Sequence, residues 1–265
     1  MRDAELINEL QTKGARLIDP SAGHENRKKT CPFCAIGQSL AAGRTIAHNT
    51  PAQLAEVAKG AVALDGITHM VLTTGTPKGP DRGAQVRADS ARAIKAAVAL
   101  PIQAQCEPPE DDIWHQRMFD AGVDTLGMHL EAVTHAVRAR IMPDKASVPL
   151  EKYFSSSVAA VKVFRRGQVS TYILAGLGDS AAAILDMAES LVAIGVYPFV
   201  MPFVPISGTP LESHLAPSAA FMASILHPLS QMTVAGGMQA RDTKAAAANA
   251  ARALPYPPME KLRHA

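Results

Sequence analysis

Apolar residues recur along the chain in two alternating patterns, short runs bounded by glycine, proline or polar residues and longer segments with helical spacing. The short runs predict strands at residues 69–73, 101–105, 124–130, 169–174 and 197–204. The longer segments predict helices at residues 50–64, 82–100, 111–121, 150–165, 180–194 and 218–229. Because strands that alternate with helices of ten or more residues form parallel βαβ units, we expect one parallel sheet covered by helices.

The first part of the chain adds weaker signals to this pattern. Residues 3–12 have helical spacing, residues 15–19 form a candidate strand, and residues 21–29 are polar and predict a loop. No GxGxxG motif follows the first strand, which favours a barrel over a dinucleotide-binding sheet. We therefore expect an α/β fold, a partial (β/α) TIM-like barrel of about six parallel strands whose first strand is weak or missing. The expected division is an N-terminal helix and loop over 1–29, the barrel over 30–245 and a C-terminal tail over 246–265.

Composition narrows the class of protein without naming a function. A chain of 265 residues is long enough for one barrel-like domain, and its net charge of +2 indicates neither nucleic acid nor a membrane as partner. The three cysteines are too few and too unevenly placed for a disulfide framework, and the charged first residues do not resemble a signal peptide. We therefore expect a cytoplasmic protein.

Polar or glycine-rich segments follow each predicted strand. In a barrel, the loops after the carboxyl ends of the strands share one face, and chemistry collects there. Glycine and proline in such loops also simply make turns, so each segment alone is a weak signal. The segments are residues 73–77, 105–109, 129–131, 176–179 and 205–210.

Cys31 and Cys34 are spaced so that both thiols can face one soft metal centre. Three functional interpretations compete: half of a zinc site, a redox dithiol, or part of an iron–sulfur ligand set. Structural zinc needs four ligands, and no second cysteine or histidine pair follows. A redox dithiol is typical of a much smaller βαβ domain. Two cysteines without any function are the remaining alternative, and the motif alone leaves the choice open.

Several motifs in order resemble the radical S-adenosylmethionine (SAM) superfamily. They are Cys31-x-Phe33-Cys34, the Gly-Leu-Gly-Asp run at 176–179 and the Gly-Thr-Pro-Leu run at 208–211. Within that superfamily the chain is similar to biotin synthase and lipoyl synthase. It most resembles the radical SAM proteins of bacterial nitrilase gene clusters, through the Cys-x-Phe-Cys-Ala-Ile, Thr-Thr-Gly-Thr and Gln-Cys-Glu-Pro-Pro runs. The resemblance covers roughly residues 30–242 and the opening segment 10–20.

The resemblance implies that Cys31 and Cys34 ligate a [4Fe–4S] cluster whose open iron binds SAM. The implied activity is cleavage of SAM and abstraction of hydrogen from a small-molecule substrate. An external electron donor, such as a flavodoxin or ferredoxin, would supply the electron. The resemblance places Gln105, Cys106 and Glu107 in the substrate cavity.

The resemblance also assigns residues to the parts of SAM. Phe33 would lie against the adenine, and the turn at 73–76 would hold the methionine amino group, although it lacks the acidic residue usual in the family. A carboxylate and a histidine would take the ribose hydroxyls, and Arg140, or alternatively Arg138, would pair with the SAM carboxylate. The full set assigned to SAM is Phe33, Thr73, Thr74, Gly75, Thr76, His129, Glu131, Arg140, Ile173 and Gly176.

The chain departs from the family at the third cluster ligand. The usual pattern is CxxxCxxC, but Arg27 stands where the first cysteine belongs, and the chain looks shortened before Cys31. His24 is our expected third ligand, since imidazole replaces thiolate in some clusters. Cys106 is the other candidate ligand. A barrel without a competent cluster, acting as a non-catalytic binding protein, is the alternative function, and a zinc-binding barrel is a third.

Overall fold

Five parallel strands form one sheet in the order β1-β2-β3-β4-β5. The computed structural model describes residues 31–44, 46, 48–73, 75–77 and 79–245. The strands are β1 (Met70–Leu72), β2 (Ile102–Gln105), β3 (Thr125–Gly127), β4 (Val169–Ala175) and β5 (Val196–Pro202). This confirms the predicted α/β fold with a parallel sheet. The candidate strand at 15–19 and helix at 3–12 lie outside the described residues.

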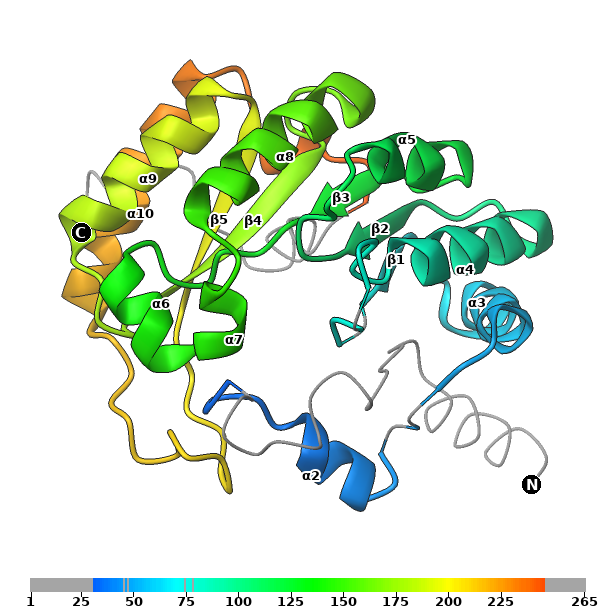
Figure 1. The fold of residues 1–265 in the computed structure, drawn as a ribbon, viewed down its shortest axis with the longest axis horizontal. Coiled ribbons are helices and arrows are strands. Elements are labelled where there is room, and N and C mark those ends of the chain that lie inside the picture. The colour runs from blue at the N-terminus through cyan, green and yellow to red at the C-terminus, as the bar shows by residue number, and fades with distance from the viewer. Residues whose placement is uncertain (1–30, 45, 47, 74, 78, 246–265) are drawn as a thin grey trace.

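Helices follow the strands and lie mainly on one side of the sheet. The helices are α2 (Ile36–Ala41), α3 (Pro51–Asp65), α4 (Ala84–Ala97), α5 (Ile113–Asp120), α6 (His135–Ile141), α7 (Pro143–Ala146), α8 (Leu150–Phe164), α9 (Ala181–Ala193), α10 (Ala219–Ala235) and the short 3₁₀ helix η2 (Ala240–Asp242). Figure 1 shows α3, α4, α5, α8, α9 and α10 along the outer side of the curved sheet. Helices α2, α6 and α7 lie apart from this layer (Figure 1).

The structure differs from the sequence-based prediction mainly in the lengths and number of helices. Helices α2, α6 and α7 were not predicted, and α10 continues past Pro228 to Ala235. A proline inside a helix usually marks its end because it removes one hydrogen bond and crowds the preceding turn. The strand predicted over 124–130 ends at Gly127, and the chain then returns to the sheet only through a bridge between Glu131 and Ile173.

Two hydrophobic clusters hold the fold together. The larger one lies between the sheet and the outer helices and includes the fully buried Leu72, Ile102 and Leu126. The smaller one comprises Ala132, Val137, Ile141, Met142, Leu177 and Phe203. Cys31 and Phe33 pack against this smaller cluster, so it fixes the cysteine loop near the ends of β4 and β5.

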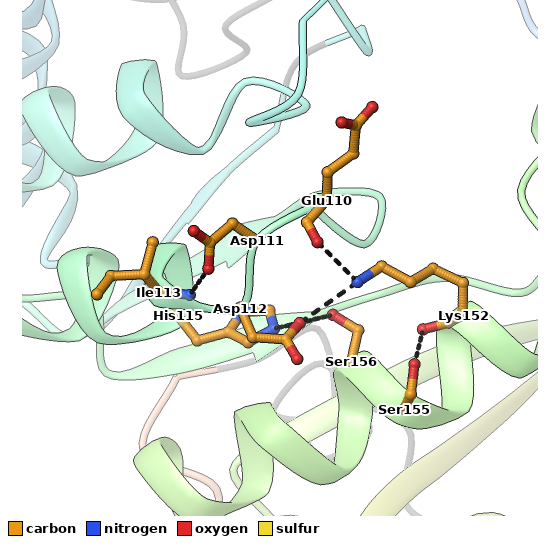
Figure 2. Close-up of polar contacts among 8 residues, drawn as sticks. All are labelled: Glu110, Asp111, Asp112, Ile113, His115, Lys152, Ser155 and Ser156. Carbon is orange, nitrogen blue, oxygen red and sulfur yellow. Dashed lines mark hydrogen bonds and ion pairs between the residues drawn. The ribbon is translucent and has the colours of Figure 1, made fainter.

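A polar network joins α5 to α8 in the outer layer (Figure 2). His115 is fully buried, and its Nε2 lies 2.9 Å from Ser156 Oγ. The Asp112 carboxylate accepts a hydrogen bond from Ser156 Oγ at 3.3 Å and lies 3.5 Å from Lys152 Nζ. Burial lowers the pKa of His115, so the ring is neutral at neutral pH and the network is structural.

Among the described residues, no helix combines the length and the apolar character needed to cross a lipid bilayer.

Candidate active site

A cavity of 520 Å³ lies where the carboxyl ends of the strands meet the cysteine loop. The loops after β1, β2 and β3 contribute most of its walls, as expected for a partial barrel. The lining residues are Phe33, Cys34, Ile36, Thr73, Gly75, Thr76, Arg87, Gln105, Cys106, Glu107, His129, Glu131, Lys145 and Tyr172. Most of the residues that the sequence singled out are therefore brought together, although Thr74 and His24 lie outside the described residues.

The cysteine loop is a tight turn held against the strand ends. The Cys34 N–H donates to the Cys31 carbonyl at 2.9 Å, and the Leu211 N–H donates to the Pro32 carbonyl at 3.3 Å. The Phe33 ring packs edge-on against Phe203 with centroids 6.3 Å apart. The loop thus presents both sulfurs from one short, anchored turn.

The two cysteines differ in environment. Cys34 is exposed and lines the cavity, whereas Cys31 is partly buried against the smaller cluster. Burial, together with the Glu131 carboxylate, raises the pKa of Cys31 to about 12, so the free thiol is protonated at neutral pH. A metal centre displaces the proton of a coordinating thiol, so this environment is compatible with metal ligation.

The described residues contain no group of three metal-ligating side chains. Cys106 is buried at the end of β2, and burial raises its pKa to about 11 despite the nearby Arg87 guanidinium. The third ligand of a cluster therefore stays a prediction, with His24 as its candidate.

His129 offers an unpartnered hydrogen-bond donor to the cavity. Its ring stacks on Tyr172 with centroids 4.1 Å apart, and its Nδ1 accepts the Tyr172 N–H at 3.1 Å. Burial, followed by the charge of Lys145, lowers the pKa of His129 to about 3, so the ring is neutral with its proton on Nε2. That Nε2 has no partner among the described residues.

Glu131 offers an acceptor to the same cavity. Its backbone is in the left-handed region, with φ +62°, and its N–H donates to the Tyr172 carbonyl at 2.8 Å. One carboxylate oxygen lies 2.9 Å from Lys145 Nζ, and the other is buried without a partner in the described part of the chain. Burial lowers the pKa of Lys145, but Glu131 and the other negative neighbours outweigh burial and raise it overall. The site therefore holds an ion pair with one acceptor left for a ligand.

Neither arginine named from the sequence lines the cavity. Arg140 is exposed and donates to the Leu177 carbonyl at 2.7 Å. Arg138 is buried and donates to the Leu130 carbonyl at 2.8 Å and to the Lys145 carbonyl at 3.0 Å. Arg138 therefore positions the backbone that carries Lys145.

The cations that do line the cavity are Arg87 and Lys145, and sequence reasoning missed both. Arg87 shares the buried face of α4 with Ala84, Ala88 and Ala91. A charged residue in register with an apolar helix face is the sequence signal that identifies it. Lys145 lies in the short α7 and carries no comparable signal.

Two further residues assigned to SAM lie outside the cavity lining. Ile173 is fully buried in β4, and Gly176 has φ +105° with Pro217 packed so closely that a Cβ would lie 2.8 Å from its ring. The same loop contains Asp179, whose buried carboxylate accepts hydrogen bonds from Val133 N–H at 2.8 Å and from Thr134 N–H at 3.1 Å. The loop thus fixes the segment that follows Glu131.

Comparison with known proteins identifies a curated relative of part of this chain. A curated relative, the bacteriochlorophyllide c C-7(1)-hydroxylase of Chlorobaculum limnaeum, is 27% identical over 222 residues, which cover 76% of this chain and 55% of the relative. The chain thus spans about half the length of that protein.

Solved structures share the fold. Methylornithine synthase superposes with a TM-score of 0.59 at 15% identity, covering 87% of this chain and 68% of that one. The FeFe-hydrogenase maturase of Carboxydothermus hydrogenoformans gives a TM-score of 0.57 at 16% identity, covering 84% and 51%. Residues 26–191, more than half of the chain, match the family description "Radical SAM superfamily". The chain belongs to the radical SAM superfamily.

Proposed function

We propose that the chain is a radical SAM enzyme that binds SAM and a small-molecule substrate together in the 520 Å³ cavity. The observation that carries this proposal is the pair of unpartnered buried atoms, His129 Nε2 and one Glu131 carboxylate oxygen, among the described residues that line the cavity. A donor and an acceptor in the same cavity suit the two hydroxyls of a ribose. Buried polar groups of this kind are costly unless a ligand satisfies them.

The proposed cofactor site uses the residues that the cavity brings together. Cys31 and Cys34 would ligate a [4Fe–4S] cluster, with His24 as third ligand. Phe33 would contact the adenine, and Lys145 would supply the positive charge for the SAM carboxylate, because it lines the cavity and Arg140 does not. The turn of Thr73, Gly75 and Thr76 would bind the amino group of the SAM methionine. Thr74, in the same turn of the sequence, keeps the role that the resemblance gave it. Gly176 and Ile173 do not line the cavity, so they would support SAM binding only indirectly, by positioning the backbone behind the cavity wall.

When bound, the cluster and SAM supply the reductive cleavage of SAM that generates a hydrogen-abstracting species. The chain's own contribution is to orient both ligands and to exclude water. Gln105, Cys106 and Glu107 would contact the substrate, and a flavodoxin- or ferredoxin-like protein would deliver the electron. Membership of the biotin-synthase-like subgroup, together with the radical SAM proteins of nitrilase gene clusters, is part of this proposal.

Anaerobic reconstitution with iron and sulfide tests the proposal. We expect about four irons per chain, an EPR signal after reduction, and release of 5′-deoxyadenosine from SAM. Cys31→Ala and Cys34→Ala abolish the cluster, His24→Ala weakens iron retention, and Cys106→Ala leaves most of the iron in place.

Other outcomes assign the site differently. Iron lost with Cys106→Ala and unchanged with His24→Ala makes Cys106 the third ligand. Wild-type protein that binds no iron yet still binds SAM in calorimetry is a non-catalytic binding barrel. Stoichiometric zinc in place of iron identifies a zinc-binding barrel.

A further inference from the structure

Arg87 is a cavity-lining cation that has no role in the proposed SAM site. It lies in the first turn of α4, is only 1% exposed and lines the cavity. Its Nη1 donates to the Arg82 carbonyl at 3.1 Å, whereas its Nε has no partner among the described residues. None of the ion pairs in the described part of the chain involves Arg87. A charge this deep is costly unless an opposite charge compensates it.

The neighbours of Arg87 do not supply that opposite charge. The Cys106 thiol is protonated at neutral pH, because burial raises its pKa to about 11. The Glu107 carboxylate is paired with Arg82, whose Nη1 lies 3.4 Å away. The Asp81 carboxylate also attracts Arg87, but its Oδ2 accepts the Gln85 N–H at 3.1 Å, and no ion pair among the described residues joins Asp81 to Arg87. Burial lowers the pKa of Arg87, and the attraction of its negative neighbours only partly offsets that effect. The guanidinium therefore lacks a committed counter-charge.

Arg87 lies at a different end of the cavity from the cysteine loop. The cysteine loop packs on the smaller cluster at the ends of β4 and β5, whereas Arg87 lies on α4, which follows β1 at the other edge of the sheet. In keeping with this placement, Lys145 acts electrostatically on Cys31 and Arg87 acts on Cys106. A cofactor bound at the cysteine loop would therefore meet Lys145. The end formed by Arg87 and Cys106 is left for the second ligand.

We propose that Arg87 binds an anionic group of the substrate, a carboxylate or a phosphate, at the Cys106 end of the cavity. This inference rests on the proposed function for the identity of the second ligand as substrate. A guanidinium presents paired N–H donors that match both kinds of anion, and its burial strengthens the attraction. A substrate without a negative charge would leave Arg87 uncompensated, so the site selects acidic molecules.

Melting temperature measured against anion concentration tests the proposal on the reconstituted protein. Inorganic phosphate and acetate are the probes, and sodium chloride keeps the ionic strength constant. An anion that binds only the folded protein raises its melting temperature, and the dependence on concentration gives an apparent Kd. We expect the matching probe to stabilise the wild type and Arg87→Met to weaken its apparent Kd by about tenfold or more. The stronger probe tells whether the substrate group is a phosphate or a carboxylate.

Arg92→Met is the matched control, since Arg92 lies on the same helix with its side chain 63% exposed. It should respond to the probe as the wild type does. Equal responses of Arg87→Met and the wild type overturn the proposal. So does a wild type that neither anion stabilises beyond sodium chloride, a result that needs no variant and holds even where Arg87→Met fails to fold.

Two parallel measurements separate this proposal from the function on which it rests. The titration is repeated with saturating SAM, and continued stabilisation by the probe supports a substrate site. Competition between SAM and the probe assigns Arg87 to the cofactor and overturns the substrate assignment. Iron content and SAM cleavage are measured on the same preparation, so that loss of the radical SAM activity is read independently of the anion response.

Discussion

Asp179→Ala should release the segment that carries Glu131 and lower the stability of the fold. The carboxylate is 6% exposed and accepts hydrogen bonds from Val133 N–H at 2.8 Å, Thr134 N–H at 3.1 Å and Thr134 Oγ1 at 2.6 Å. The substitution leaves two backbone donors without their acceptor, and each unsatisfied buried group costs about 1–3 kcal/mol. Two such groups would cost about 2–6 kcal/mol, and because water reaches part of this loop after the change, we expect a total loss of about 2–4 kcal/mol.

Urea unfolding followed by circular dichroism measures this loss as the free energy of unfolding. Asp186→Ala is the matched control, since Asp186 is exposed on α9, and it should change stability by less than about 0.5 kcal/mol. Asp179→Asn keeps one carbonyl acceptor and should fall between the two. If the free energies of unfolding of Asp179→Ala and the control differ by less than 1 kcal/mol (about fivefold in the equilibrium constant), other contacts hold the loop and the reasoning is refuted.

Three further perturbations probe the buried histidines. Burial depresses the folded-state pKa of His129 from 6.5 to about 3, so stability is complete above pH 6.5 and is lost as pH falls toward 3. Between pH 7.5 and 5.5, the free energy of unfolding in urea should therefore fall by about 1.4 kcal/mol more for the wild type than for His129→Gln. Equal decreases in the two proteins would contradict this. Gly127→Ala places a Cβ 2.7 Å from His129 Cε1 and should weaken SAM binding in calorimetry without unfolding the protein; unchanged affinity would exclude the ring from the site. Ser156→Ala leaves His115 Nε2 without its hydrogen-bond partner and should lower the free energy of unfolding in urea by about 1–3 kcal/mol. Ser155→Ala, on the exposed side of the same helix, should leave stability unchanged (Figure 2). Equal effects of the two variants would exclude the His115 hydrogen bond as the cause.

Hydrophobic periodicity predicted the sheet and its outer helices because those elements bury largely apolar faces. The same rule explains why α6 was missed and why Arg87 was not recognised. Arg138 and Arg87 are each 1% exposed, and each interrupts the apolar face of its helix. Periodicity treats a long basic side chain as a surface residue, although its charge can be satisfied by backbone carbonyls, as that of Arg138 is.

The polar side chains of the cavity were predictable from their positions at the strand ends. Gln105 ends β2, Glu107 follows it, and His129 and Glu131 follow β3. All four line one cavity at the carboxyl ends of the strands, as parallel strands require. Lys145 was not predictable, because its place in the cavity depends on the path of the chain after α6, which no local pattern determines. Long-range placement of this kind comes from tertiary packing rather than from propensity.

The attachment of the cysteine loop to the smaller cluster has a consequence for cooperativity. Helix α2, which follows the loop, contains no buried residue, and the loop packs through Cys31 and Phe33 on a cluster separate from the main core. We therefore expect the loop to open as a local unit, at a free energy well below that of global unfolding. Its amide hydrogens should exchange with solvent much faster than those of β2 and β3. A cluster held by the proposed ligands and lost to oxygen would then be replaceable while the sheet and its outer helices stay folded.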